Sequence, residues 1–240
     1  MKKLVFILSL LANLVFIIAF GYFIHAKGGM SYLKSKLKSN NNETISSASQ
    51  NPYWEHRKTQ FELLPNSVDE IIFLGNSITD GCEWAELFNN PSIKNRGISG
   101  DRTQGILDRM TEITESHPKK IFIMIGINDL SAKISTAKIL ENYQSIIDTI
   151  RQSTPETRIF IQSVLPTYQL PHIQNDSVAY LNSKLEILAS KYKIDFIDLY
   201  SKFINEDGEL NMNLSSDGLH LNGEGYLLWK REIEDFINEP

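Results

Sequence analysis

The stretch DEIIFLGNSITDG, residues 69–81, decides the fold. Its four apolar residues, Ile71 to Leu74, form a run of the length expected for a strand that is buried on both faces. Gly75 ends the run, and Asn76 and Ser77 follow in a turn. A serine at a strand-to-helix turn commonly caps the helix. A chemical role for Ser77 therefore depends on what the other strand ends carry.

Similar apolar runs recur along the chain, at 93–97, 120–126, 158–165 and 194–199. Segments 136–152 and 176–192 instead carry apolar residues three and four positions apart, the spacing of a helix with one buried face. Strands that alternate with helices imply right-handed crossovers and a parallel sheet covered on both faces. The sequence therefore predicts an α/β fold, a three-layer α/β/α sandwich around a five-stranded parallel sheet.

Ligands of such sheets bind beyond the carboxyl ends of the strands. The second run ends in NRGISGD, which supplies Gly100, and the third ends in GINDL, which supplies Asn128. The segment SSDGLHLNGEGY near the carboxyl terminus supplies Asp217 and His220. A serine, hydrogen-bond donors, and an acid three residues before a histidine are the groups needed for acyl transfer.

Each of these groups has a defined task in that chemistry. A serine hydroxyl attacks only when a base takes its proton, and the ordinary pKa of histidine suits this role. A carboxylate three residues away, Asp217, could hold the His220 imidazole in one tautomer. The backbone N–H groups of Ser77 and Gly100 and the side-chain amide of Asn128 are suitable donors to an oxyanion.

Four blocks of this sequence resemble those of the SGNH hydrolases, also called the GDSL-type lipase and esterase family. They are GNSITDG, NRGISGD, GIND and DGLH, in that order, and the resemblance extends over roughly residues 52–238. It implies a flavodoxin-like fold, no metal ion and no cofactor, and hydrolysis of esters or thioesters through an acyl-serine intermediate.

The resemblance also implies a role for each matching residue. Ser77 would be the nucleophile, His220 the base and Asp217 the group that orients it, and Ser77, Gly100 and Asn128 would form the oxyanion hole. One residue departs from the family pattern, because Asn76 occupies the position before the serine where the family usually has an acid. Since that residue is not a member of the triad, the mechanism is unaffected.

The block spellings are most similar to those of platelet-activating-factor acetylhydrolase subunits and bacterial carbohydrate O-acetylesterases. This branch implies removal of a short acyl group, acetyl above all, from a carbohydrate. One alternative is a lysophospholipase or thioesterase that acts on longer acyl chains. A second is a non-catalytic carbohydrate- or nucleotide-binding domain of the same fold, in which the Ser77 turn would cradle a phosphate. A metal site at Asp217 and His220 lacks a third ligand of recognisable spacing.

Several residues close to the blocks have simpler readings. Asp129 is expected to cap the helix after the third strand, and Cys82 to be a small buried side chain. Trp84 could line the substrate site or pack the first helix. Segment 165–176, LPTYQLPHIQND, is expected to form a loop over the rim of the active site.

The amino terminus differs in character from the rest of the chain. Residues 4–23, LVFILSLLANLVFIIAFGYF, carry no charge and could span the ~30 Å core of a bilayer as a helix. An uncleaved anchor is favoured over a secretory signal because the run is long and no clear cleavage site follows. We therefore expect an anchor over 1–25, a flexible tether over 26–50 and the hydrolase domain over 51–240, outside the cytoplasm.

Charge narrows the range of partners. Residues 1–50 hold six Lys and one Glu, which leaves 18 basic and 28 acidic side chains, a formal net charge of −10, for residues 51–240. Phosphate backbones need a basic face, so nucleic acid is not an expected partner. With a single cysteine, Cys82, no intrachain disulfide can form, and the fold must rest on its core. The sequence does not indicate an oligomeric state.

Overall fold

The computed structural model describes residues 52–239 and the isolated positions Ser9, Asn13, Tyr22 and His25. The chain divides into two units, Met1–Ser46 and Ser47–Pro240, and the sheet belongs to the second. The predicted membrane helix, residues 4–23, lies outside the described residues except at three of those positions. None of the described helices has the length and apolar character needed to cross a bilayer.

A single five-stranded parallel sheet forms the centre of the domain, in the order β2-β1-β3-β4-β5. The strands are β1 Ile71–Gly75, β2 Ile93–Gly97, β3 Lys120–Met124, β4 Arg158–Gln162 and β5 Asp195–Ile197. The predicted sheet is confirmed, and its order is that of the flavodoxin-like class. Strands β3 and β4 end before the apolar runs do, because Ile125 and Val164 pack into the core without joining the sheet.

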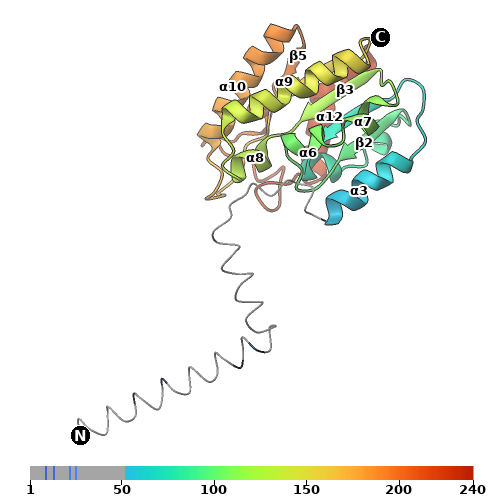
Figure 1. The fold of residues 1–240 in the computed structure, drawn as a ribbon. Helices are drawn as coiled ribbons and strands as arrows, with labels where there is room; N and C mark the ends of the chain where they lie inside the picture. Colours follow the sequence, from blue (N-terminus) through green and yellow to red (C-terminus); the bar gives the residue numbers. More distant parts are fainter. Residues whose placement is uncertain (1–8, 10–12, 14–21, 23–24, 26–51, 240) are drawn as a thin grey trace, which may run out of the picture. The chain divides into compact units, whose positions relative to one another are not determined.

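The two helices predicted from apolar spacing are confirmed as α9 Thr136–Ser153 and α10 Asn175–Tyr192. The other long helices are α3 Pro52–Leu63, before the sheet, and α12 Gly223–Asn238, after it. The remaining helices are one or two turns long: α4 Ser77–Asp80, α5 Trp84–Leu87, α6 Thr103–Leu107, α7 Met110–Thr114, α8 Ile127–Ser131 and α11 Tyr200–Phe203. Figure 1 shows α9 and α10 side by side over one face of the sheet.

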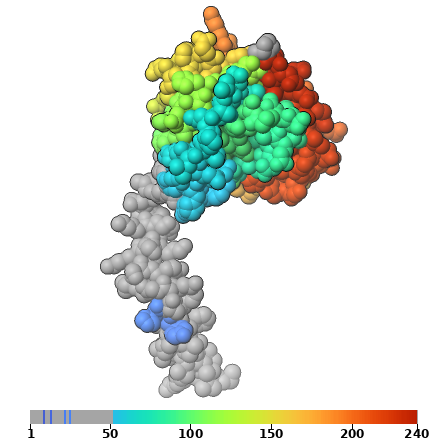
Figure 2. All heavy atoms as spheres, turned by 90° about the vertical axis from the view of Figure 1, so that its right-hand side faces the viewer, coloured from blue at the N-terminus to red at the C-terminus, as the bar shows by residue number. Residues whose placement is uncertain are grey.

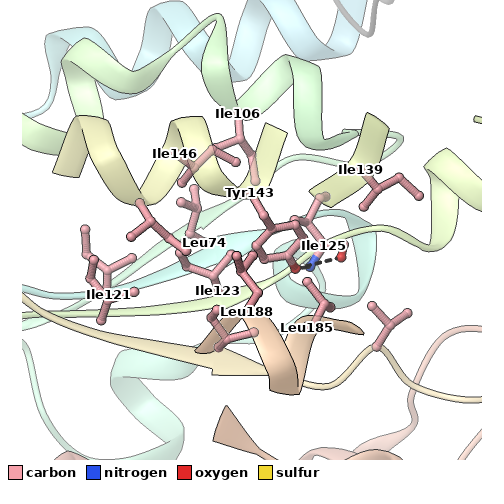
Figure 3. Packing of buried hydrophobic residues seen from close by; sticks show 14 of the residues in the cluster. Leu74, Ile106, Ile121, Ile123, Ile125, Ile139, Tyr143, Ile146, Leu185 and Leu188 are labelled. Atoms are coloured by element: carbon pink, nitrogen blue, oxygen red, sulfur yellow. Dashed lines mark hydrogen bonds between the residues drawn. The ribbon is translucent and has the colours of Figure 1, made fainter. Parts of the chain in front are cut away.

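Alternating side chains of the central strands feed two separate cores. From β1, Ile72 and Leu74 join the cluster beneath α6, α7, α9 and α10, whereas Ile71 and Phe73 join the cluster beneath α4, α5, α11 and α12. Successive residues of a strand point to opposite faces, so a run that is apolar throughout is buried by both helix layers. Figure 3 shows the first cluster, in which the Tyr143 hydroxyl donates to the Ile125 carbonyl, 2.8 Å away.

Aromatic rings fill the second core. Phe73, Phe122 and Phe160 occupy neighbouring strands and stack with ring centroids 5.3 Å and 4.4 Å apart. Trp84 stacks on Phe73 at 4.3 Å and meets the edge of Trp229 from α12 at 4.8 Å. Rings of this size bury large areas and have few rotatable bonds, so they fix the sheet relative to α5 and α12.

The first helix of the domain, α3, lies against the β2 edge. Trp54 and Phe61 of α3 form a small cluster with Ile98, which follows β2, and the Arg96 guanidinium lies over the Phe61 ring. Figure 2 shows the cyan residues of α3 beside the bluish-green residues of this edge. The helix therefore covers the segment that continues from β2 toward Gly100.

The last helix is fastened to the sheet by a buried lysine. Lys120 begins β3, is 1% exposed, and donates its Nζ hydrogens to the carbonyls of Phe236, Ile237 and Glu239 at the end of α12. These carbonyls have no partner within the helix itself, since the last four of any α-helix lack one. An ammonium at this position also complements the negative end of the helix dipole.

Candidate active site

The carboxyl ends of β1, β2 and β3 meet at one edge of the sheet. Gly75, the last residue of β1, is in register with Gly97 of β2 and Met124 of β3, so the three strands end level with one another. Ser77 follows β1, Gly100 follows β2 and Asn128 follows β3. Because β1 lies between β2 and β3, the serine emerges between the strands that carry the two other groups.

Asn76 accounts for the shape of the serine turn. Its side-chain oxygen accepts a hydrogen bond of 3.0 Å from the Ile78 N–H and so caps α4, whose first residue is Ser77. An amide oxygen performs this task as a carboxylate does, which explains how Asn can replace the acid of the family pattern. Gly75 is required just before it, because a Cβ there would lie 2.6 Å from the Met124 carbonyl oxygen.

Ser77, His220 and Asp217 form a continuous hydrogen-bonded line. His220 Nε2 is 2.9 Å from Ser77 Oγ, and His220 Nδ1 is 2.7 Å from Asp217 Oδ2. The second carboxylate oxygen of Asp217 accepts from the backbone N–H of His220 at 2.8 Å and of Leu219 at 2.9 Å. The structure thus brings together the three side chains that the sequence predicted as a triad.

The electrostatics of Asp217 suit a group that stays ionised. Partial burial raises the pKa of its carboxyl, but the hydrogen bonds from the His220 ring and from the His220 and Leu219 N–H groups outweigh it and lower the pKa to about 2. Both members of the pair remain open to solvent, since the side chain of His220 is 45% and that of Asp217 55% exposed. A substrate can therefore reach the imidazole from outside.

The loop that carries this pair is supported from below. Ser215 Oγ accepts from the Gly218 N–H at 3.0 Å, and the Gly218 carbonyl accepts from the Tyr168 N–H at 2.9 Å. Gly218 has a φ of +82°, and a Cβ there would lie 2.6 Å from the Tyr168 carbonyl oxygen. Tyr168 belongs to segment 165–176, so this segment does border the Asp217–His220 loop, as predicted.

The candidate oxyanion donors lie on neighbouring loops that are bonded to each other. Asn128 Nδ2 donates to the carbonyl oxygen of Asp101, the residue after Gly100, at 2.9 Å. Gly100 has a φ of +82°, a left-handed conformation that glycine adopts without a steric penalty. Within residues 52–239, the backbone N–H groups of Ser77 and Gly100 have no acceptor. Both remain available to an incoming oxygen.

A buried ionic network lies under the Gly100 loop. The Asp101 carboxylate is fully buried and accepts from Arg109 and from the Trp54 indole, each at 3.0 Å. Arg109 also binds Glu112 at 3.0 Å, and Glu112 pairs with Arg96 at 3.2 Å. The sequence analysis did not identify this network. Its members are far apart along the chain, and only the acid beside the glycine of NRGISGD was a local signal.

Asp129 does not cap the helix after β3, so that prediction was wrong. It lies within α8, is fully buried, and accepts from the N–H of Thr103 at 3.1 Å and from its hydroxyl at 2.6 Å. It therefore binds the first turn of α6, which lies earlier in the chain. Burial raises the pKa of its carboxyl to about 6, although the Thr103 hydrogen bonds oppose the change.

Two neighbouring residues have structural roles. Trp84 is 1% exposed and donates its indole N–H to the Thr79 carbonyl at 2.8 Å, so it packs the first helices rather than lining the site. Cys82 is buried, and burial raises the pKa of its thiol to about 12, which fits the predicted inert side chain. Among the described residues, no group of three or more His, Cys, Asp or Glu side chains could hold a metal ion.

Comparisons with known proteins agree with this geometry. The model of a family described as GDSL-like lipase/acylhydrolase matches residues 73–228. The alpha2 subunit of platelet-activating factor acetylhydrolase IB from Rattus norvegicus is 25% identical over 192 residues, which cover 77% of this chain and 83% of that protein.

Solved structures show the same similarity. A GDSL-like lipase from Bacteroides thetaiotaomicron superposes with a TM-score of 0.68 and 25% identity, covering 77% of this chain and 96% of that one. An acetylxylan esterase from Geobacillus stearothermophilus gives a TM-score of 0.60 at 18% identity, over 73% of this chain and 96% of that one. The second similarity is one of fold alone.

Proposed function

Because the chain belongs to the GDSL-like lipase/acylhydrolase family and is an ester hydrolase, we propose that it is a serine esterase with Ser77 as nucleophile. The observation that carries the proposal is the line from Ser77 Oγ through the imidazole of His220 to Asp217, with spacings of 2.9 Å and 2.7 Å. The substrate we propose is a short acyl ester, acetyl above all, on an oxygen of a carbohydrate.

The proposed cycle has two halves. In the first, His220 Nε2 takes the Ser77 proton as Oγ attacks the ester carbonyl, and then gives that proton to the departing alcohol oxygen. In the second, His220 takes a proton from water, which attacks the acyl-serine and releases the carboxylic acid and free Ser77. In both, the N–H groups of Ser77 and Gly100 and the Asn128 amide would donate to the oxyanion, and ionised Asp217 would stabilise the imidazolium.

The acyl group and the alcohol are supported less directly. The name of the 25% identical relative specifies an acetylhydrolase, and that of the fold neighbour specifies an acetylxylan esterase. The first supports acetyl as the group removed, and the second supports a carbohydrate as its carrier. The proposal of a carbohydrate ester therefore rests on a similarity of fold and on the block spellings.

The function is tested with the full chain in detergent and p-nitrophenyl acetate as substrate. Ser77→Ala should lower kcat/KM by about a thousandfold or more, because the nucleophile is lost. It should also abolish labelling by a fluorophosphonate probe. Ser145→Ala is the matched control, since the Ser145 hydroxyl only donates within α9, to the Glu141 carbonyl. Unchanged hydrolysis by Ser77→Ala with an unchanged circular dichroism spectrum would refute the proposal.

A longer acyl chain is the second candidate, favoured by the uncharged stretch 4–23, which could hold the enzyme at a lipid surface. Acyl esters of graded length distinguish the two candidates. A site for acetyl should lose kcat/KM steadily beyond about four carbons, whereas a lysophospholipase or thioesterase should gain it. Absence of both hydrolysis and probe labelling would instead favour a non-catalytic binding domain.

We propose further that residues 1–25 anchor the protein in a membrane and that residues 26–50 tether the domain outside the cytoplasm. The support is the uncharged run 4–23 followed by a Ser-, Asn- and Lys-rich segment without aromatic residues. Protease treatment of intact cells tests the orientation. Cleavage of the tether by external protease is the expected result, and protection until the cells are lysed would place the domain inside.

A further inference from the structure

The nucleophile helix α4 is too short to hold its own position. It has four residues, Ser77–Asp80, and a single helical turn is not stable by itself. Its anchors come from elsewhere. The Asn95 side-chain amide of β2 lies 3.0 Å from the Thr79 carbonyl and 3.1 Å from the Asp80 carbonyl, and the Tyr226 hydroxyl donates to the Ile78 carbonyl at 2.9 Å. The placement of Ser77 therefore depends on contacts outside the turn.

The carboxylate of Asp80 connects this helix to the candidate oxyanion loop. One of its oxygens, Oδ2, accepts from the Ser99 N–H at 3.1 Å and from the Ser99 hydroxyl at 2.8 Å. Asp80 is the last residue of α4, one turn after Ser77, and Ser99 immediately precedes Gly100. A single carboxylate thus spans the nucleophile and the loop that presents the Gly100 N–H.

Helix α3 completes this connection from outside. Tyr53 donates its hydroxyl to Asp80 Oδ2 at 2.7 Å, and Arg57 pairs with Asp80 Oδ1 at 3.3 Å. The side chain of Asp80 is only 9% exposed. Trp54, on the same helix, binds the carboxylate of Asp101 on the other side of Gly100 at 3.0 Å. Both neighbours of Gly100 are therefore linked to α3, Ser99 through Asp80 and Asp101 directly.

From this arrangement we infer that Asp80, held by Tyr53 of α3, is a positioning residue for the ester hydrolysis proposed above. It fixes the distance between the Ser77 hydroxyl and the Gly100 N–H, neither of which it touches through its carboxylate. Attack and oxyanion stabilisation need both groups in place together, and a misplacement of about 1 Å can cost about 100-fold in rate. The inference rests on the proposed function, because it assigns Asp80 a role only in a reaction at Ser77.

Three substitutions in the full chain test it. Tyr53→Phe removes one hydroxyl, Ser99→Ala removes one donor, and Asp80→Asn keeps the shape of the side chain but removes its charge. Asp80→Asn should lower kcat by about tenfold or more and leave KM within about twofold, because the interaction acts on the transition state. Tyr53→Phe and Ser99→Ala should give smaller decreases of the same kind. Tyr180→Phe, an exposed tyrosine on α10, is the matched control.

A double-mutant cycle separates positioning from a general loss of structure. If Asp80 acts through the oxyanion hole, its effect on kcat should shrink when Asn128 is already alanine, because the hole is then incomplete. Rates are normalised to the fraction of enzyme labelled by the fluorophosphonate probe. Wild-type kcat in all three single variants, a change confined to KM, or full additivity with Asn128→Ala would overturn the inference.

These outcomes are distinct from failure of the proposed function, which would appear as Ser77-independent activity in the wild-type chain. If Asp80→Asn does not fold, Tyr53→Phe and Ser99→Ala still decide the matter. Each removes a single hydroxyl from the surface of the carboxylate without leaving a buried charge unpaired.

Discussion

His220 Nε2 lies 2.9 Å from the hydroxyl of Ser77, although 143 residues separate the two in the chain. The two arrive by different routes. Ser77 is fixed by the end of a central strand, whereas His220 lies on a loop that is held by Ser215, Tyr168 and its own bond to Asp217. The base can therefore be altered without disturbing the sheet, which makes the following variants informative.

Asp217→Asn should lower kcat by about a thousandfold or more while the protein stays folded. The amide cannot accept a hydrogen from the ring and at the same time stabilise a positive charge on it. Because the pKa of the Asp217 carboxyl is about 2, the wild-type group is ionised throughout the usual assay range. Steady-state hydrolysis of p-nitrophenyl acetate measures the effect, with the exposed Asp207→Asn as control. A decrease below about tenfold would contradict the orienting role.

Asn128→Ala should lower kcat by about 100-fold with little change in KM, because a donor to the oxyanion is lost. The substitution also removes the 2.9 Å bond to the Asp101 carbonyl, so thermal unfolding must be measured alongside. Asn213→Ala serves as control, since its side chain is exposed. A change in KM alone would mean that Asn128 binds the substrate rather than its transition state.

Gly97→Ala should weaken both stability and activity. A Cβ at this position would lie 2.2 Å from the Asp80 nitrogen and 2.7 Å from the Thr79 carbonyl carbon, so the α4 backbone would have to move. We expect a loss of about 1 to 3 kcal/mol in the free energy of unfolding and a lower kcat, measured by urea denaturation and ester hydrolysis. Gly223→Ala, where nothing lies within 4 Å, should change neither. Equal behaviour of the two variants would contradict the expected clash.

Asp129→Asn should alter how stability depends on pH. The pKa of Asp129 rises from 3.8 to about 6 in the folded state, so the folded protein holds this proton more tightly than the unfolded chain. From this group, the free energy of unfolding falls as pH rises from about 4 to about 6. The variant should therefore gain stability relative to wild type by about 2 to 3 kcal/mol between these limits. Urea unfolding at several pH values tests this, and a constant difference would contradict it.

Much of the candidate site could be predicted from local patterns. Each of its residues follows a strand or lies in a short block, and parallel strands bring their carboxyl ends together whatever the length of chain between them. The turn at Ser77 was predictable for the same reason. The function of Asn76 as a cap needed only its neighbour Ile78, two positions away, yet the comparison with an acid in the family pattern hid it.

The supporting contacts could not be predicted in this way. Asp80 is bonded to Tyr53, 27 positions earlier, and to Ser99, 19 positions later. Asp129 binds Thr103 across 26 positions. No periodicity of charge or hydropathy encodes such pairs, because they form only when separate helices and loops have packed. The same holds for Trp84, whose burial depends on Phe73 and Trp229.

Lys120 makes the two ends of the domain unequal as places for engineering. Its ammonium is satisfied by the carbonyls of Phe236, Ile237 and Glu239, so a chain shortened by even five residues would leave a buried cation facing a gap. Such a deletion removes few contacts from the surface, but it strands a charge beneath the central sheet. Fusion partners, affinity tags and surface couplings should therefore be placed so that the final turn of α12 keeps its native backbone.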